Sequence, residues 1–288
     1  MGGTDINNTE IKESKYFKDA NDIVYKLLCE LDRVCVKYGI KYQLACGTLL
    51  GAVRNGDVIP WDDDVDIYIT KKELKKLLKH KSEFGDGFTL VMPSDYGKNV
   101  YYDNVVRLNY DYAYILPDDE KNRYYNGLRR KLGLDFFLLT PVPEGVEGLF
   151  HKLRLGLLYG LANSFRYSCI LPGYGRFMRM AAHILYPFGK LIGLKRLRKA
   201  IRDNFCRYSD HDCKYVHVSN GTLSELFLLF KRDWFEETEY MKIREHSFPV
   251  PKKYHELLTK IYGDYMQLPP EDKRRWHFAD PDHFVLIK

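Results

Sequence analysis

Residues 42–69, YQLACGTLLGAVRNGDVIPWDDDVDIYI, decide the fold of this 288-residue chain. A β-rich run, Tyr42 to Cys46, ends at the pair Gly47-Thr48, and the helix-like segment LLGAVR follows. An Asn55-Gly56 turn then leads to four aspartates that run directly into a second apolar strand, Val65 to Ile69. Acidic residues at the head of an apolar strand, shortly after a Gly-Thr turn, form the candidate functional site.

The spacing of these aspartates predicts a metal site. Alternate residues of a strand share one face, so Asp64 and Asp66 are expected to project together, about 6 to 7 Å apart, with Asp62 in the same parity. Asp63 is expected to point the other way and is left out of the predicted ligands. Carboxylate oxygens favour a hard divalent ion, Mg²⁺ or Mn²⁺, which commonly brings phosphate with it. The alternative is a solvated acidic loop without a ligand.

The segment GTLLGAVRNGDVIPWDDDVDI closely resembles the signature of the LicD/fukutin family, a branch of the nucleotidyltransferase-fold superfamily. The resemblance implies a Gly-Thr pair on the turn after the first strand, here Gly47-Thr48. It also implies two acidic residues, one residue apart, at the next strand, here Asp64 and Asp66, and a third acid on a later strand. One or two Mg²⁺ or Mn²⁺ ions are the implied cofactors.

Asp135 is the predicted third acid, within the apolar run KLGLDFFLLT, residues 131–140. A buried carboxylate without a partner costs several kcal/mol, so Asp135 needs a cation or a hydrogen-bond donor. The family has a similar apolar-Asp-apolar-aromatic strand at this place in the chain order. The alternative is a carboxylate satisfied by backbone amides or by an arginine such as Arg129.

A second block of resemblance, FPVPKKYHELLTKIYGDYMQLPPEDKRRWH, covers residues 248–277 and resembles the closing motif of the family. Its pattern predicts a helix from about residue 252 to 262, which Gly263 ends. The basic residues Lys273 and Arg274, followed by His277, are expected to approach the site from the opposite side. The alternative is an ordinary surface charge run.

Several residues of the motif suit a phosphate. Gly47 and Thr48 supply backbone N–H groups and a hydroxyl at a helix N-terminus, where the helix dipole favours anions. Arg54 at the other end of that helix is expected to hold another phosphate oxygen. Arg107 occupies a place where the family tends to have a basic strand residue, with a surface arginine as the alternative.

The resemblance implies the transfer of a phospho-alcohol, often phosphocholine, from a CDP-activated donor to a hydroxyl of a cell-surface glycan, such as lipopolysaccharide or teichoic acid, or its lipid-linked precursor. The acceptor hydroxyl attacks the distal phosphorus and CMP leaves, with Asp64 and Asp66 on the metal and Asp135 orienting or deprotonating the hydroxyl. CDP-choline is the first choice of donor. CDP-ribitol or CDP-glycerol, nucleotidyl transfer from an NTP, and a catalytically silent glycan-binding relative are the alternatives.

A choline donor calls for aromatic side chains around its quaternary ammonium. Tyrosines are common, 23 in all, and Tyr110, Tyr112 and Tyr114 share one face of a predicted strand. They are the candidate choline cage, although strand tyrosines often only pack.

The positive charge is concentrated in one segment, residues 148–202, which has eleven Lys or Arg and no Asp or Glu. This segment is also rich in Leu, Phe, Tyr and Met, but its uncharged stretches are too short to cross a bilayer. Basic and apolar residues in helical lengths predict a basic amphipathic helical insertion that docks on the cytoplasmic face of a membrane. The alternatives are a subdomain packed on the core whose charge binds substrate phosphates, and, less favoured, nucleic acid.

Length and composition predict one sizeable domain, residues 1–288, that carries this insertion, and the resemblance implies that this domain has the nucleotidyltransferase fold. The polar N-terminus has no apolar signal sequence, which predicts a cytoplasmic protein located peripherally at the inner face of the membrane. The spacing of Cys206, His211, Cys213 and His217 matches no common zinc pattern, so reduced thiols are expected.

The remaining pattern favours an α+β fold, a mixed sheet flanked by helices, because strands and helices do not alternate regularly. Apolar positions at three- and four-residue spacing predict an amphipathic helix from residue 16 to 38. Residues 71–79, KKELKKLLK, are expected to form a short solvated helix. Strands are expected over residues 88–92, 101–108 and 110–115.

Overall fold

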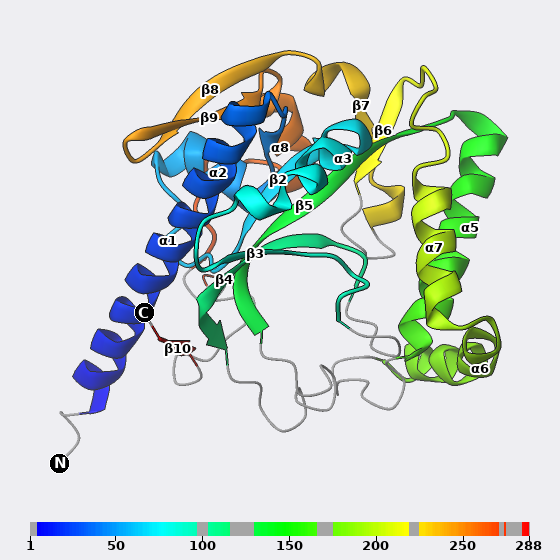
Figure 1. The fold of residues 1–288 in the computed structure, drawn as a ribbon, viewed down its shortest axis with the longest axis horizontal. Coiled ribbons are helices and arrows are strands. Elements are labelled where there is room, and N and C mark those ends of the chain that lie inside the picture. Colours follow the sequence, from blue (N-terminus) through cyan, green and yellow to red (C-terminus); the bar gives the residue numbers. More distant parts are fainter. Residues whose placement is uncertain are drawn as a thin grey trace.

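The computed structural model describes residues 5–96, 103–115, 130–165, 175–218, 225–270, 274 and 284–287. It has the mixed α+β architecture expected from the sequence, a curled sheet with helices around it (Figure 1). The helices are α1 (Asp5–Tyr38), α2 (Cys46–Asn55), α3 (Lys71–Lys79), α5 (Gly145–Asn163), α6 (Arg176–Ile192), α7 (Leu194–Phe205) and α8 (Tyr254–Tyr262), with the 3-10 turns η1 (Lys81–Glu83), η3 (Glu225–Phe227) and η4 (Arg232–Phe235). The strands are β1 (Gln43–Leu44), β2 (Val65–Thr70), β3 (Phe88–Val91), β4 (Val106–Ile115), β5 (Arg130–Val142), β6 (Tyr215–Val218), β7 (Phe230–Lys231), β8 (Thr238–Ile243), β9 (His246–Pro251) and β10 (Phe284–Leu286).

The sheet is built around β5, which is central in the order β1-β2-β5-β4-β10 and also pairs with β6. Strands β2 and β5 are parallel, whereas β4 and β6 pair with β5 antiparallel. In this register Asp66 lies opposite Asp135, and Arg107 on β4 also lies opposite Asp135. Three charged residues therefore sit side by side on three neighbouring strands.

The opposite face of the sheet forms the main core. Ile67, Leu134 and Phe136 are at most 1% exposed, and α1 covers this face with side chains such as Leu27 and Leu31. Alternation along β2 and β5 therefore buries the apolar residues against α1 and directs Asp66 and Asp135 to the other face.

Some predicted boundaries are wrong. The first strand spans only Gln43–Leu44, because the chain already enters α2 at Cys46. The two strands predicted over residues 101–108 and 110–115 form one strand, β4, within the described residues, and its pairing with β5 is irregular between Asn109 and Tyr114. A single long strand with an irregularity in the middle looks like two strands in sequence.

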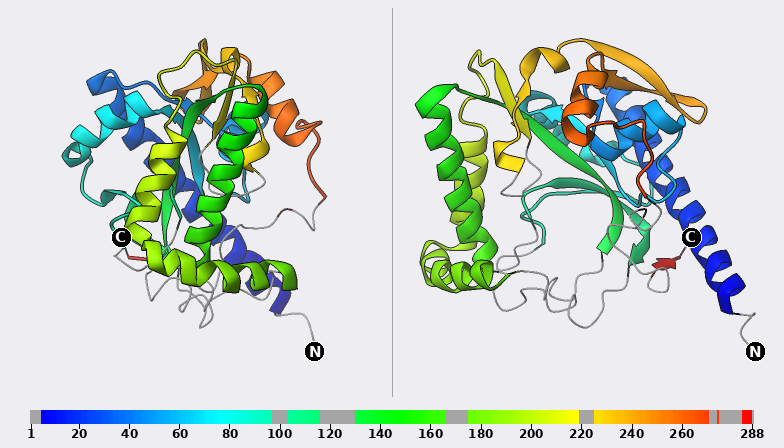
Figure 2. Two further views of the ribbon diagram at one scale, coloured as in Figure 1. Left: turned by 90° about the vertical axis from the view of Figure 1, so that its right-hand side faces the viewer. Right: turned by 180° about the vertical axis from the view of Figure 1, so that it is seen from behind.

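Helices α5, α6 and α7, the predicted insertion, stand together at one end of the molecule (Figure 1). Leu155 and Tyr159 of α5 and Leu194, Ile201 and Phe205 of α7 form a second buried cluster. Figure 2 (left) shows α6 lying across the ends of the other two helices. Among the described helices, none combines the length and the apolar character needed to cross a bilayer.

Candidate metal and phosphate site

The aspartates lie in a turn that is anchored from both sides. Asn21 on α1 donates through Nδ2 to the carbonyl oxygen of Asp62 at 3.1 Å, and the Asp62 N–H donates to the Ile59 carbonyl at 2.9 Å. Earlier in the same loop, the Arg244 guanidinium binds Asp57 at 3.0 Å and Asp22 at 2.7 Å. Contacts from distant parts of the chain therefore fix the path that leads into β2.

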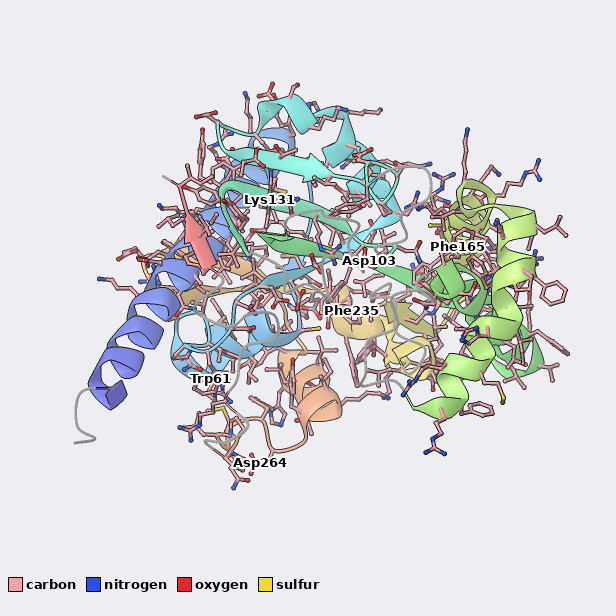
Figure 3. All side chains as sticks on the ribbon, turned by 90° about the horizontal axis from the view of Figure 1, so that it is seen from below. Trp61, Asp103, Lys131, Phe165, Phe235 and Asp264 are labelled. Carbon is pink, nitrogen blue, oxygen red and sulfur yellow. The ribbon has the colours of Figure 1, made fainter. Side chains whose placement is uncertain are left out.

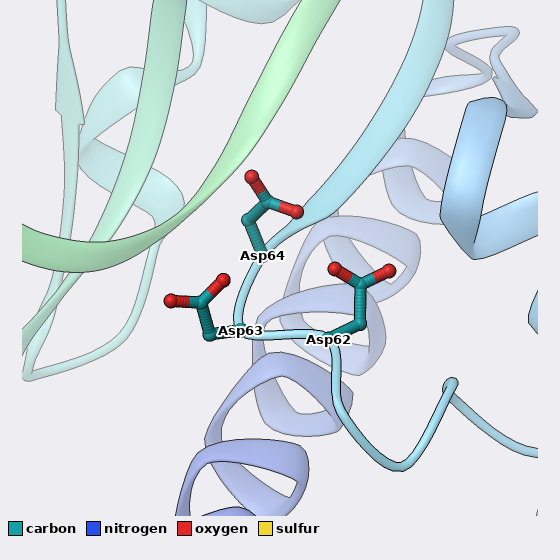
Figure 4. Close-up of side chains that lie close together, drawn as sticks. All are labelled: Asp62, Asp63 and Asp64. Atoms are coloured by element: carbon teal, nitrogen blue, oxygen red, sulfur yellow. The ribbon is translucent and has the colours of Figure 1, made fainter. Parts of the chain in front are cut away.

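Asp62, Asp63 and Asp64 each offer a carboxylate oxygen within 4.8 Å of the others. Figure 4 shows these three side chains, with the carboxylates of Asp62 and Asp63 directed to different sides. Asp63 is only 1% exposed and lies within this group, but its carboxylate is directed away from that of Asp62, so its exclusion from the ligands stays a prediction. Strand β2 begins at Val65, so strand alternation does not govern the three residues before it.

Asp66 is held among like charges. Burial raises its pKa well above the ordinary value, and Asp64, Asp135 and Asp62 raise it further, whereas Arg107 lowers it. Several carboxylates that oppose one another's ionisation are the donor set that a hard divalent cation satisfies. Asp62, Asp64 and Asp66 therefore fit a Mg²⁺ or Mn²⁺ ion.

Asp135 has an arginine partner. Arg107 Nε and Nη2 bind its two oxygens at 2.7 and 2.9 Å, and Arg107 Nη1 binds Asp103 at 2.7 Å. Arg107, which was predicted to bind the donor phosphate, thus lies between two carboxylates. The sequence left open that an arginine satisfies Asp135, and the structure shows such an arginine, Arg107 instead of the suggested Arg129. Residue 129 lies outside the described residues. The role of Asp135 as a metal ligand stays a prediction.

The N-terminus of α2 is adapted to Asp62. A Cβ on Gly47 would lie 2.5 Å from Asp62 Oδ2, so only glycine leaves room for this carboxylate. Thr48 is 3% exposed, and its Oγ1 accepts a hydrogen bond from the Asp66 N–H at 2.8 Å. Gly47 and Thr48 therefore position two of the aspartates, in addition to the phosphate-binding role predicted for them.

Two arginines flank an aromatic ring beside α2. The guanidinium carbons of Arg54 and Arg274 lie 5.9 and 5.4 Å from the Trp61 ring, and Figure 3 shows Trp61 next to α2. Burial lowers the pKa of Arg54, and the positive charge of Arg274 lowers it further. The structure thus brings together Arg54 from the first motif and Arg274 from the second at one aromatic ring, and their binding of phosphate stays a prediction. Lys273 and His277 lie outside the described residues.

Aromatic residues near the carboxylates were missed in the sequence. Burial raises the pKa of Tyr262 in α8, and Cys46, Asp66, Asp62 and Asp64 raise it further, so its phenol lies close to the site. Burial also raises the pKa of Tyr96, whose phenol lies beside Arg107. Tyr262 falls within the second motif, which was the available signal, whereas nothing in the local sequence of Tyr96 pointed to the site.

The contacts described for the candidate choline cage are structural. Tyr110 is 7% exposed and packs against Phe88, with ring centroids 5.4 Å apart. The Tyr112 hydroxyl donates to Asp86, and the Tyr110 and Tyr112 rings meet edge to face at 5.7 Å. The cage of Tyr110, Tyr112 and Tyr114 stays a prediction.

The cysteines and histidines near residue 210 do not form a metal cluster within the part of the chain that the structure describes. The His217 ring instead stacks on the Phe205 ring, with centroids 4.3 Å apart. The His151 ring centroid lies 5.5 Å from that of His217. Burial lowers the pKa of His151 to about 4 and that of His217 to about 3, so both are neutral near pH 7.

Comparison with known proteins agrees with the motifs. Residues 39–124 match the family model described as LicD/FKTN/FKRP, nucleotidyltransferase domain. The chain is 24% identical over 256 residues, 85% of its length, to the lipopolysaccharide cholinephosphotransferase LicD of Haemophilus influenzae, of which the match covers 89%. It is 61% identical over 31 residues to human ribitol 5-phosphate transferase FKRP, a match that covers 11% of this chain and 6% of FKRP. The resemblance to the LicD/fukutin family is confirmed.

Proposed function

From the premise that residues 39–124 belong to a LicD/FKTN/FKRP nucleotidyltransferase domain, we propose that this phosphotransferase moves phosphocholine from CDP-choline to a hydroxyl of a cell-surface glycan or its lipid-linked precursor, releasing CMP. One observation carries the proposal. The aspartates at the head of β2 lie against the N-terminus of α2, where carboxylates for a cation adjoin backbone N–H groups for a phosphate. The long match to a cholinephosphotransferase supports choline as the transferred alcohol.

Asp62, Asp64 and Asp66 would hold one or two Mg²⁺ or Mn²⁺ ions, with Asp63 adjoining them. When bound, such an ion supplies positive charge that neutralises the donor diphosphate. The fit rests on the opposed carboxylates of this structure.

The remaining residues bind and orient the reactants. The first N–H groups of α2 and the Arg54–Arg274 pair would offer positive charge to the donor diphosphate. Asp135, fixed by Arg107, orients the acceptor hydroxyl and accepts its proton. The hydroxyl oxygen forms the new bond to the distal phosphorus, and the bond from that phosphorus to the CMP oxygen breaks.

Ribitol phosphate is the second candidate for the transferred group, because a 31-residue segment of the chain is 61% identical to human ribitol 5-phosphate transferase FKRP. Glycerol phosphate follows by the same chemistry. A catalytically silent glycan-binding relative is the candidate from another class, and the complete set of carboxylates argues against it.

Thermal-shift measurement with Mg²⁺ tests the donor. CDP-choline at a hundred times its Kd should stabilise the fold by about 2.7 kcal/mol, and the stabilisation should disappear with EDTA. Stabilisation by CDP-ribitol alone would replace choline by ribitol. CMP release only after acceptor is added distinguishes the transferase from a silent binding protein, and stabilisation by ATP alone would contradict both CDP donors.

We further propose that the protein acts at the inner face of a membrane, docked through α6. Phe177, Met180, Ile184, Phe188 and Leu191 lie at three- and four-residue spacing along α6 and are 74, 54, 57, 59 and 83% exposed. Basic residues accompany this apolar stripe, and α6 lies at the end of the molecule (Figure 2). These are the properties of a helix that lies in the headgroup region of an anionic bilayer.

Sedimentation with vesicles tests this docking. Wild-type protein should sediment with phosphatidylglycerol-containing vesicles at low salt and less as salt rises, because headgroup attraction is screened. Phe177→Ser with Phe188→Ser should reduce sedimentation several-fold and leave turnover of a short soluble acceptor unchanged. Sedimentation equal to wild type, or concentration-dependent dimers that disappear in the variant, would contradict membrane docking.

A further inference from the structure

A basic groove lies beside α3, away from the carboxylates. It encloses about 740 Å³ between α3, the distal ends of β2 and β5, β6 and η4, and none of the site aspartates lines it. Its basic lining residues are Lys71, Lys72, Lys75, Lys76, Lys79 and Arg232. The short helix expected over residues 71–79 is confirmed as α3, and one side of it forms a wall of this groove.

The lysine row is unfavourable for the helix itself. Lys71–Lys75, Lys72–Lys76 and Lys75–Lys79 are like-charged pairs at i,i+4 spacing, each of which costs a few tenths of a kcal/mol. Lys71 and Lys72 also place positive charge at the positive end of the helix dipole. This arrangement lowers helix stability unless an anion offsets it.

Acidic residues offset only part of this charge. Lys76 pairs with Glu73 at 3.0 Å, and Arg232 pairs with Asp212 at 2.9 Å. Among the described residues, Lys71, Lys72, Lys75 and Lys79 make no ion pair within 4.0 Å, and the acidic lining residues are Asp210 and Glu236. The groove therefore keeps a positive excess.

The groove lies on the same face of the sheet as the carboxylates. Thr70 and Leu139, which line the groove, follow Asp66 and Asp135 by four residues on their strands, which keeps the parity and corresponds to about 13 Å. Phe235 contributes an apolar surface to the groove and packs edge to face on Tyr68, with centroids 5.3 Å apart. A molecule in the groove lies about 13 Å along the sheet from the reacting groups.

We propose that this groove binds an anionic oligosaccharide, the part of the acceptor that extends away from the hydroxyl to be modified. The donor diphosphate belongs at the aspartates and the N-terminus of α2, so the distant positive charge serves another ligand. A lysine row along a groove with apolar patches suits a sugar chain that carries phosphate or carboxylate groups. That this oligosaccharide is the acceptor of the reaction rests on the proposed function, whereas the binding of an anionic glycan in the groove does not depend on it.

The test compares two charge-matched variants. In the first, Lys72→Gln, Lys75→Gln and Lys79→Gln remove charge from the groove; in the control, Lys195→Gln, Arg196→Gln and Lys199→Gln remove the same charge from α7. Binding of fluorescent phosphorylated maltoheptaose is measured by anisotropy with Asp64→Asn as background, so that turnover does not interfere. The groove variant should bind about tenfold more weakly and the control as the parent does. The thermal midpoint of the groove variant should be unchanged or higher than that of the parent, because repulsion between the α3 lysines is relieved.

Several outcomes would overturn the groove proposal. One is that the groove variant binds phosphorylated maltoheptaose as tightly as the parent, and another is that the α7 control loses as much affinity as the groove variant. The proposal also fails if the parent binds neutral maltoheptaose as tightly as the phosphorylated form, or binds a DNA oligonucleotide of equal charge more tightly. A loss of sedimentation with anionic vesicles in the groove variant alone would assign the groove to lipid. If glycan binding behaves as expected while no CDP donor supports turnover, the proposed function fails and the groove site stands.

Discussion

Asp64→Asn is expected to lower turnover by about a thousandfold or more while leaving the thermal midpoint unchanged or raised. The activity is lost because the amide supplies a neutral ligand in place of a carboxylate among the opposed aspartates. Stability is kept because Asp64 is the charged neighbour that most raises the pKa of Asp66, so removing its charge relieves repulsion. Turnover is measured as CMP release, and the thermal midpoint by calorimetry without metal.

Asp203→Asn is the matched control, because Asp203 is an exposed carboxylate on α7 that pairs with Lys199 at 2.6 Å. It should leave turnover unchanged. Wild-type turnover that survives EDTA, or an Asp64→Asn enzyme with near-normal activity, would contradict the metal mechanism. A large fall of the midpoint in Asp64→Asn would show instead that the aspartate holds the fold.

The position of the site could be predicted because strand alternation is local. The apolar residues of β2 and β5 must face α1, which puts Asp66 and Asp135 together on the other face, and that pattern is visible in the sequence. The partner of Asp135 could not be predicted, because Arg107 reaches it across an antiparallel pairing whose register depends on the whole sheet. Strand parity could not predict the orientation of Asp63, because the strand begins only at Val65.

The basic groove shows the same limit at larger scale. The lysine row of α3 is plain in the sequence, but a charged helix face is usually only solvated. Its significance depends on Arg232 and Phe235, which follow more than 150 positions later in the sequence and face α3 across the groove. Local pattern identifies which side chains are charged, whereas the tertiary contacts decide which of them line one groove.

The glycines of the first motif are expected to separate catalysis from stability. In Gly47→Ala the new Cβ would lie 2.5 Å from Asp62 Oδ2, the end of a side chain that can move away. In Gly51→Ala it would lie 2.6 Å from the Asp57 carbonyl oxygen and 3.1 Å from the Ile59 nitrogen, both backbone atoms that can move only with the loop. The two variants make the same chemical change in one helix and differ in what they displace.

Gly47→Ala should therefore lose about a hundredfold in turnover, because it displaces a metal-site carboxylate, and should keep its free energy of unfolding, since alanine favours the helix. Gly51→Ala should lose about 1 to 3 kcal/mol of unfolding free energy, measured by urea titration, because the α2 contact with the loop is overpacked. Gly175→Ala is the control for both, since nothing lies within 4 Å of its new Cβ. Metal binding by calorimetry should weaken in Gly47→Ala and not in Gly175→Ala. If Gly47→Ala unfolds as readily as Gly51→Ala, or binds Mg²⁺ and turns over as wild type does, Gly47 does not shape the aspartate site.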